Sequence, residues 1–379
     1  MALLSLIVLR ASTDRPSRPS EAINTIPDGP SARSWPTAPG ACGADTPLPI
    51  VSSEPPAEHT AIQVLLGGER LRLVDFDSGR ATTLPDAVIR PGGYAAVLAG
   101  DPVTAYATTG SCNETAPYAM LRIGADHQVS LIRPLGPTEW PLADGHRVWI
   151  TSFASDIDNP YGTIAPIAGG QRVRLPLGFY ASAIVGDTIV GLMQPDPGIS
   201  PTWLALVDAT TGRLQAKLEQ HVAPLAAGAG QVFWTSGCDD DASPCTLHRR
   251  SIDGGETVGS PLPRHACCGV VSPDGTRMAF LIDRASADPR FDDHPLPPMD
   301  IAIMHVDTGR MSIVPGIELP ARSKPGLAFA ARGDWLAIAL DTGSRTRLLA
   351  WRPGLQQPYE TNALPGVVHD PPTLVVTTH

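Results

Sequence analysis

Gly269-Val-Val-Ser-Pro-Asp-Gly-Thr-Arg-Met-Ala-Phe-Leu-Ile282 has the pattern of a strand, a tight turn and a second strand. Pro273 fixes φ at the second position of the turn, and Asp274-Gly275 tolerates the positive φ that closes it. Met278, Phe280 and Ile282 follow at every second position, as expected for one face of a strand. The stretch therefore predicts a β-hairpin.

The same pattern recurs along the chain. Leu327–Leu340 aligns with the first stretch without a gap at an offset of 58 residues, which pairs Gly275 with Gly333. Weaker relatives are Tyr94–Ala107, Pro141–Ile150, Ala181–Leu192, Pro224–Thr235 and Gly366–Thr378. Recurrence of one hairpin at a regular interval is typical of a repeat architecture.

A second hairpin series lies between the copies of the first. Its three best copies share Val-Asp, a Gly-containing turn and Arg, and they cover residues 74–80, 207–213 and 306–310. A weaker copy covers residues 252–256. Together the two series give two hairpins about every 43 residues, which is the length of one four-stranded blade of a β-propeller. We therefore predict an all-β fold.

The phase of the repeats predicts how the ring closes. The chain enters on a second hairpin at 61–84 and leaves on a first hairpin at 366–378, so each end would supply two strands to one shared blade. Pairing the termini removes the exposed edge of an open array. We predict a β-propeller over residues 61–379 with seven blades, six or eight being the alternatives.

Residues 1–60 differ from the rest in composition. After the apolar run Leu3–Val8 the chain is rich in Pro, Ser, Thr and Ala, which indicates an arm or linker. The apolar run is too short to span a bilayer, so we expect no transmembrane span in this chain. It is either the remnant of a signal or anchor whose start lies upstream, or a frayed apolar end.

Composition limits the function classes. The net charge is −10, from 28 Lys and Arg against 38 Asp and Glu, which argues against a nucleic-acid or anionic-membrane surface. With 40 Pro and 36 Gly, no amphipathic period of three or more helical turns persists. We expect a monomer.

Strands that run alternately up and down a blade place the long connections on one face of the disc. These predicted loops are Thr109–Ala116, Ser152–Gly162, Met193–Thr202, Ser236–Pro244, Asp283–Met299 and Asp341–Thr346. Their acidic residues are the candidate binding residues Asp156, Asp158, Asp239, Asp240, Asp241, Asp292 and Asp293, with Asp283, Asp288 and Asp300 in or beside the largest loop. Long polar loops on a rigid scaffold are where binding usually occurs.

The acidic loops have two interpretations. One is a Ca²⁺ site or a surface for a basic partner, and the other is a solvated rim that aids solubility. Asp156-x-Asp158-Asn159 begins like a calcium loop, but Pro160 and Gly162 break the ligand spacing and no Glu follows at the twelfth position. We therefore expect no cofactor, with Ca²⁺ as the alternative.

Six cysteines, several of them in polar loops, favour disulfides and an oxidising compartment over unrelated reduced thiols. Cys238 with Cys245 is the first choice. Cys267 and Cys268 would need a strained ring to bond each other, so they could instead reach the first two. By elimination, the remaining predicted disulfide joins Cys42 to Cys112. A zinc site with His265 or His248 is the alternative, although the Cys-x-x-Cys spacing of structural zinc is absent.

No catalytic motif is present in the sequence. It contains no Gly-x-Ser-x-Gly, no Gly-rich phosphate loop and no His-Glu-x-x-His, so we assign no catalytic and no metal-binding residue. His146, His248 and His305 are interpreted as structural. Tryptophans recur on predicted strands at 149, 203, 234, 335 and 351; we expect them to pack between blades rather than to stack on sugars.

Val271-Ser272-Pro273-Asp274-Gly275-Thr276-Arg277-Met278-Ala279-Phe280 resembles the repeat of TolB-like, or WD40-like, β-propeller proteins. The stretch 329–337 is a decayed copy that lacks the Ser, Pro and Asp. The resemblance implies a periplasmic or secreted propeller that is often a platform for protein interactions and often not an enzyme. It implies no catalytic residues.

Two hypotheses follow. The first is an extracytoplasmic, non-enzymatic propeller that binds a protein or small-molecule partner on its acidic, cysteine-bearing face. The second is a propeller hydrolase or lyase that acts on a carbohydrate or lactone at the central channel, which would need two or more Asp, Glu or His side chains at the channel mouth.

Overall fold

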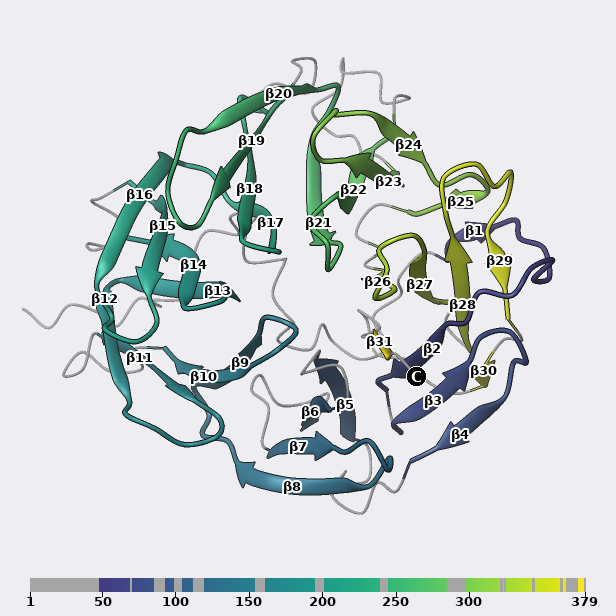
Figure 1. The fold of residues 1–379 in the computed structure, drawn as a ribbon, viewed down its shortest axis with the longest axis horizontal. Helices are drawn as coiled ribbons and strands as arrows, with labels where there is room; N and C mark the ends of the chain where they lie inside the picture. Colours follow the sequence, from purple (N-terminus) through teal and green to yellow (C-terminus); the bar gives the residue numbers. More distant parts are fainter. Residues whose placement is uncertain are drawn as a thin grey trace, which may run out of the picture.

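The computed structural model describes residues 48–68, 70–84, 93–98, 104–111, 119–153, 161–194, 201–238, 245–284, 298–320, 323, 325–342, 345–361, 364–365 and 374–377. Seven antiparallel sheets stand in a ring around a central axis, each forming one blade (Figure 1). The predicted all-β, seven-bladed propeller is confirmed. No helix in the described part of the chain has the length and hydropathy needed to cross a membrane.

Blades 1 to 6 follow one another in chain order, and each begins with its inner strand. Blade 1 consists of β5 (Gly93–Leu98), β6 (Ala105–Ser111), β7 (Ala119–Ile123) and β8 (Val129–Pro134). Blade 2 consists of β9 (Glu139–Ala143), β10 (Val148–Ser152), β11 (Tyr161–Pro166) and β12 (Val173–Leu177). Blade 3 consists of β13 (Phe179–Val185), β14 (Thr188–Met193), β15 (Trp203–Asp208) and β16 (Leu214–Gln220).

Blades 4 to 6 repeat this order. Blade 4 consists of β17 (Pro224–Gly228), β18 (Gln231–Ser236), β19 (Cys245–Ser251) and β20 (Val258–Leu262). Blade 5 consists of β21 (Ala266–Val271), β22 (Arg277–Asp283), β23 (Met299–His305) and β24 (Met311–Ile313). Blade 6 consists of β26 (Gly326–Phe329), β27 (Leu336–Asp341), β28 (Arg345–Trp351) and β29 (Tyr359–Glu360), and the short β30 (Leu364–Pro365) also pairs with β28.

Blade 7 closes the ring with strands from both ends of the chain. The N-terminal part supplies β2 (Gln63–Leu66), β3 (Arg72–Asp75) and β4 (Ala81–Thr83), and the C-terminal β31 (Leu374–Thr377) pairs with β2 as the inner strand. Closure by pairing of the termini is therefore confirmed. The predicted division into two strands from each end is wrong. The three strand-like segments after residue 60 all join one four-stranded sheet, so only its inner position is left for a C-terminal strand.

The hydrophobic core is divided among the seven boundaries between blades, each of which holds one cluster of buried side chains. Strand β22 shows how one strand contributes to two of these clusters. Met278, Phe280 and Ile282 pack into the cluster shared with blade 4, whereas Ala279 and Leu281 pack into the cluster shared with blade 6. Because successive side chains of a strand point to opposite faces, a strand that is apolar on both faces joins two neighbours.

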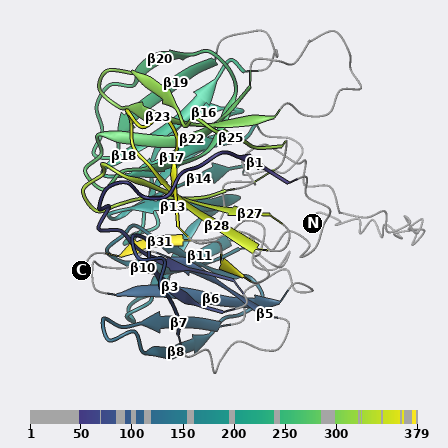
Figure 2. The same cartoon turned by 90° about the vertical axis from the view of Figure 1, so that its right-hand side faces the viewer.

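Two opposite faces of the disc result from this topology (Figure 2). The turns within the first and second hairpins of each blade lie on one face, which we call the turn face. The links from the second to the third strand, and from blade to blade, lie on the other, which we call the loop face. The strands that flank the predicted long loops end on the loop face, as expected from the sequence.

The Ser272–Gly275 turn forms as predicted, and Gly275 has a φ of +71°. The amide N–H of Gly275 donates to the carbonyl of Ser272 at 2.8 Å. Arg277 then reaches the neighbouring blade and donates to the carbonyl of Gly333 at 2.8 Å. Similar contacts between blades on this face join Arg147 to Asp187 at 2.8 Å, and Arg249 to Asp307 at 2.9 Å.

Asp274 fixes the shape of this turn. Its Oδ1 accepts hydrogen bonds from the Ser272 hydroxyl at 2.6 Å and from the amide of Thr276 at 3.0 Å. Burial alone would raise the pKa of Asp274, but the hydrogen bonds from Ser272 and Thr276 and the charge of Arg277 outweigh it, so the pKa lies below the ordinary 3.8.

This geometry predicts how substitutions of Asp274 respond to pH. Asp274→Ala should lower the free energy of unfolding at pH 7 by about 1–2 kcal/mol, because the turn loses its acceptor. Asp274→Asn should cost less, because the amide oxygen still accepts. A depressed pKa in the folded state stabilises the protein above the ordinary pKa, and this contribution is lost as the pH falls through the folded value. Urea titrations should therefore show the gap between wild type and Asp274→Asn shrinking below pH 3.8, and a gap that widens there would contradict the assignment.

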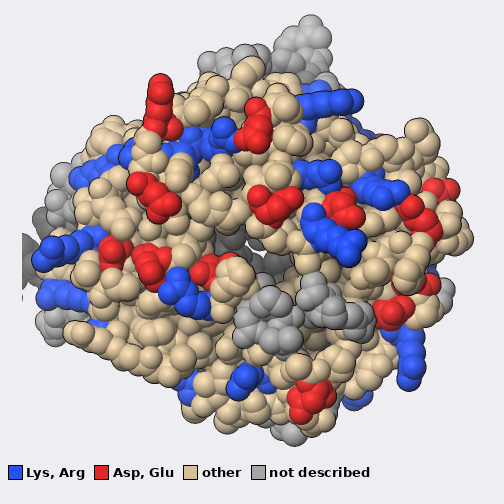
Figure 3. Space-filling view, in the orientation of Figure 1, with Lys and Arg blue, Asp and Glu red and all other residues tan. Residues whose placement is uncertain are grey.

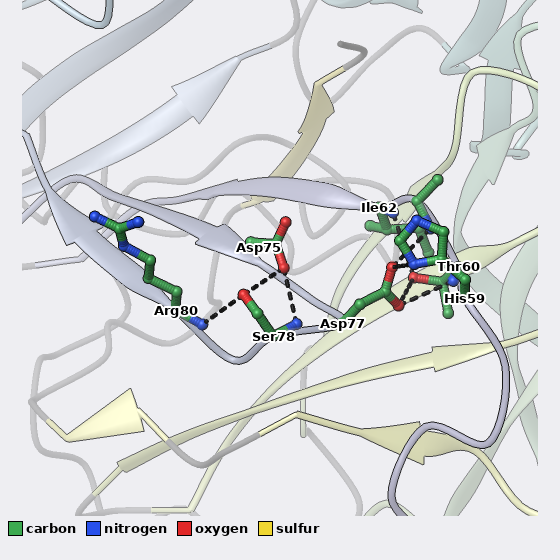
Figure 4. Close-up of polar contacts among 8 residues, drawn as sticks. His59, Thr60, Ile62, Asp75, Asp77, Ser78 and Arg80 are labelled. Carbon is green, nitrogen blue, oxygen red and sulfur yellow. Dashed lines mark hydrogen bonds and ion pairs between the residues drawn. The ribbon is translucent and has the colours of Figure 1, made fainter.

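The chain before blade 7 lies against blades 5 and 6. Strand β1 (Ile50–Val51) pairs with β25 (Ile317–Glu318), and Arg347 donates to the hydroxyl of Ser53 at 2.9 Å. Asp77, in the turn between β3 and β4, accepts from the amides of Thr60 at 2.9 Å and Ala61 at 3.0 Å (Figure 4). The described part of the N-terminal arm is thus held at several points.

Candidate functional site

The acidic residues predicted to bind a partner lie outside the described residues. These are Asp156, Asp158, Asp239, Asp240, Asp241, Asp292 and Asp293. Two carboxylates that the structure places on the loop face, Asp300 and Glu318, share a basic partner. Arg284, just after β22, donates to Asp300 at 2.7 Å and also pairs with Glu318. The Asp300 hydrogen bond is the main cause that raises the pKa of Arg284. This part of the face is therefore held by ion pairs.

The turn face carries both signs of charge. Figure 3 shows it with a hollow at its centre, and Lys and Arg side chains interspersed with Asp and Glu around that hollow. Two ion pairs on this face cross blade boundaries, Arg147 with Asp187 and Arg249 with Asp307. Because the charges are mixed and partly paired, the described residues of this face form no extended surface of a single sign.

The cysteine predictions are resolved in part. Cys238 and Cys245 form a disulfide with Cα atoms 4.8 Å apart, which confirms the first choice and closes the base of the loop between β18 and β19. Cys267 and Cys268 do not join that pair; their Sγ atoms lie 2.7 Å from each other. Cys42 and Cys112 lie outside the described residues. Among the described residues, no group of three or more His, Cys, Asp or Glu could hold a metal ion.

Three aromatic side chains form a row at the loop face, which we call the aromatic row: Trp140, Phe153 and Tyr180. The ring centroids of Trp140 and Phe153 are 6.4 Å apart, and those of Phe153 and Tyr180 are 6.1 Å apart. Tyr180 is 40% exposed, and the other two are half-buried. The row crosses the boundary between blades 2 and 3, from the start of one inner strand to the start of the next.

This row was not predicted from the sequence, although a signal for it exists. Trp140 and Tyr180 each occupy the second position of an inner strand, β9 and β13, in successive blades. Large side chains at equivalent positions of consecutive repeats lie on the same face at neighbouring blades. Phe153 follows β10 directly and fills the space between them.

An ion cluster lies beside the aromatic row. Glu139 precedes Trp140 in β9, pairs with Arg133 and accepts from Arg172 at 3.2 Å and from the amide of Gly136 at 2.9 Å. Burial alone would raise the pKa of Glu139, but the hydrogen bond from Gly136 and the two arginines hold it below its ordinary value. The first residue of the strand is thus fixed, and this restrains the backbone that carries Trp140.

A second cluster lies next to the disulfide: Glu219, Trp234, Ser236 and His248. The indole N–H of Trp234 donates to Glu219 at 2.5 Å, and the Trp234 and His248 rings stack at 5.2 Å. Ser236 Oγ lies 2.7 Å from His248 Nε2, which is also the ring nitrogen nearest Glu219, at 3.6 Å. In a Ser-His-acid triad the acid orients the other ring nitrogen. The arrangement differs from that triad, and its contacts link β16, β18 and β19.

The remaining tryptophans behave mostly as expected. Trp149, Trp234, Trp335 and Trp351 are buried, and each belongs to a cluster between two blades, which confirms interblade packing. Trp203 is half-buried, with the Lys217 ammonium 5.3 Å from its ring centroid.

No family model and no curated protein sequence matches the chain. Solved structures similar to it include TolB from Acinetobacter baumannii, with 13% identity over 80% of this chain and 78% of that one, and a TM-score of 0.45. Apo AztD from Citrobacter koseri has 11% identity over 83% and 98%, with a TM-score of 0.48. An oligogalacturonate lyase in complex with manganese has 11% identity over 79% and 86%, with a TM-score of 0.46. TolB is thus among the solved structures that this chain resembles, and the likeness is one of fold.

Proposed function

We propose that the chain is an extracytoplasmic β-propeller that acts as a non-enzymatic binding module and engages a protein or small-molecule partner on its loop face. The observation that carries the proposal is the aromatic row. Aromatic side chains that remain partly exposed at the rim of a rigid scaffold supply contact area at little cost in conformational entropy. Trp140 and Tyr180 lie near the loop-face ends of the inner strands β9 and β13.

The site is held rigidly on both sides of the row. Glu139 and its two arginines restrain β9 beside Trp140, and Phe179, next to Tyr180, is buried in the cluster between blades 2 and 3. A preorganised contact surface loses little entropy on binding. The acidic residues of the predicted loops would favour a partner of positive charge.

An extracytoplasmic location is supported by the Cys238–Cys245 disulfide, because such bonds persist in oxidising compartments. Six free thiols in protein purified from its native compartment would refute this part of the proposal.

Replacing Tyr180 should weaken binding without affecting the fold. We expect Tyr180→Ala to reduce partner capture by roughly tenfold or more, as for an aromatic residue that carries much of the binding energy. The measurement is quantitative mass spectrometry of proteins captured from a cell-envelope extract, with wild type and variant compared side by side. Charge reversal at Asp239–Asp241 and at Asp292–Asp293 tests the loops in the same assay.

Val258→Ala is the matched control. Val258 is 48% exposed but lies on β20, an outer strand away from the loop-face ends of the inner strands. It should leave capture unchanged, and both variants should keep the wild-type unfolding midpoint. Equal capture by wild type and Tyr180→Ala would show that the aromatic row is not the binding surface.

A further inference from the structure

Cys267 and Cys268 are adjacent residues of β21, the inner strand of blade 5. In a regular strand, successive side chains point to opposite faces, so two neighbouring cysteines would diverge. Here their Sγ atoms lie 2.7 Å apart. The backbone at this position must therefore depart from a regular strand.

A β-bulge provides that departure. The register between β21 and β22 pairs Cys267 with Leu281 and then shifts before Val270 pairs with Ala279, so Cys268 and Gly269 fall within the bulge. Cys268 also has a φ of +60°, a conformation uncommon for a residue other than glycine. Bulges often redirect a side chain beside a functional site.

The packing around the bulge restricts alternative arrangements. Both cysteines contact the same hydrophobic cluster, between blades 5 and 6, and both are half-buried. A Cβ added to Gly269 would lie 3.0 Å from the carbonyl oxygen of Leu225 and 3.1 Å from the Cβ of Ala226, both on β17 of the adjacent blade. The bulge is thus confined by a neighbouring strand, and it keeps the two sulfur atoms on one side.

We propose that Cys267 and Cys268 form a redox modification site that closes to a vicinal disulfide by exchange with a disulfide donor, such as glutathione disulfide. One thiolate attacks a donor sulfur, forms a mixed disulfide and releases the first donor thiolate. The neighbouring thiolate then attacks the cysteine sulfur of the mixed disulfide, forms the Cys267–Cys268 bond and releases the second donor thiolate. Two electrons pass from the cysteines to the donor, and the two cysteine protons end on the two released thiols.

This site lies near the loop-face end of β21 in blade 5, away from the aromatic row between blades 2 and 3, and it is distinct from the Cys238–Cys245 disulfide. Cys238 and Cys245 are bonded to each other in blade 4, so the second pair can close without exchanging with the first. The strained ring that argues against bonding between adjacent cysteines is offset here, because the bulge already brings the sulfur atoms together before any bond forms.

Tryptic digestion gives a direct test on the full chain. Cleavage after Arg264 and Arg277 yields a peptide, residues 265–277, that contains these two cysteines and no other. The protein is reduced, equilibrated in glutathione buffers of graded composition, quenched with acid, alkylated and digested. A peptide lighter by two hydrogen atoms and without alkyl groups reports the vicinal disulfide. We expect half-closure in the folded protein at a glutathione disulfide level roughly tenfold lower than in the same chain unfolded in guanidinium chloride.

The same digest contains an internal control. Residues 218–249 form a peptide with Cys238 and Cys245, and its disulfide confirms that the buffers are oxidising. In Cys267→Ser, the remaining Cys268 should stop at the mixed disulfide and carry one glutathione. Two alkylated cysteines in the folded wild type, at buffers that close the pair in the unfolded chain, would overturn the proposal. So would a bond from either residue to another cysteine.

Discussion

Gly212→Ala should lower the free energy of unfolding by about 3 kcal/mol or more, whereas Gly309→Ala should lower it by only about 1 kcal/mol. The two glycines occupy the same place in two copies of the Val-Asp-turn-Gly-Arg hairpin, with φ of +69° and +66°. The backbone strain of an alanine is therefore equal at the two positions. The two positions differ in the atoms that the added Cβ would contact.

A Cβ at Gly212 would lie 2.0 Å from the carbonyl oxygen of Arg174 and 2.9 Å from a methyl carbon of Val173. Both residues belong to β12 of the preceding blade, and the oxygen is backbone, so relief requires the two blades to separate. A Cβ at Gly309 would meet nothing within 4 Å. The difference between the two variants thus isolates the close approach of one blade to the next.

Equilibrium unfolding in urea measures both changes, and the slope of the transition shows whether the native state has loosened. The single variants are each other's control, because sequence context and φ are matched. Equal losses of stability in Gly212→Ala and Gly309→Ala would mean that blades 2 and 3 do not pack as closely as the structure shows.

Much of the fold could be predicted from the sequence because turns in a propeller are set by local chemistry. Asp274-Gly275, Gly186-Asp187 and Gly333 mark hairpin turns that need only a few adjacent residues. Their regular spacing then gave the number of blades. The strands that close the ring were harder to predict, because β31 and β2 are at opposite ends of the chain. No local signal shows which of the two short apolar segments near the C-terminus, 366–368 or 373–376, pairs with β2.

The candidate sites were harder to predict because they depend on contacts between blades. Trp140, Phe153 and Tyr180 are separated in sequence and meet only when two inner strands lie side by side. The convergence of Cys267 and Cys268 depends on a register shift against β22. A strand pattern with period two implies that adjacent cysteines diverge, and Gly269 within the strand is a weak signal for the bulge that reverses this.

Removing β31 should destabilise the whole propeller. A chain that ends before Leu374 loses the inner strand of blade 7, whose residues pair with Gln63–Leu66 of β2. Leu374 is buried in the cluster between blades 6 and 7, and its burial alone is worth about 1.5–3 kcal/mol. Loss of the ladder hydrogen bonds adds about 0.5–1.5 kcal/mol for each. We expect the free energy of unfolding to fall by about 3 kcal/mol or more.

The truncation also changes the topology of the sheet, which distinguishes it from the loss of a single buried side chain. Without β31 the ring is open, and β2 presents an unpaired edge on its inner side that can pair with another chain. Light scattering should therefore show association of the truncated protein at concentrations where wild type stays dispersed. Leu374→Ala is the matched comparison: it should cost about 2–5 kcal/mol as a cavity but keep the strand and the dispersed state.

A chain that lacks only residues 378 and 379 keeps β31 and should match wild type in both measurements. If removal of β31 left the stability and the dispersed state unchanged, the C-terminal strand would not be what closes the ring. The proposed function also depends on this closure: the aromatic row spans two blades, and an open ring would let neighbouring blades move apart. Loss of partner capture in the truncated chain, with Tyr180 and Trp140 intact, is therefore expected together with the loss of stability.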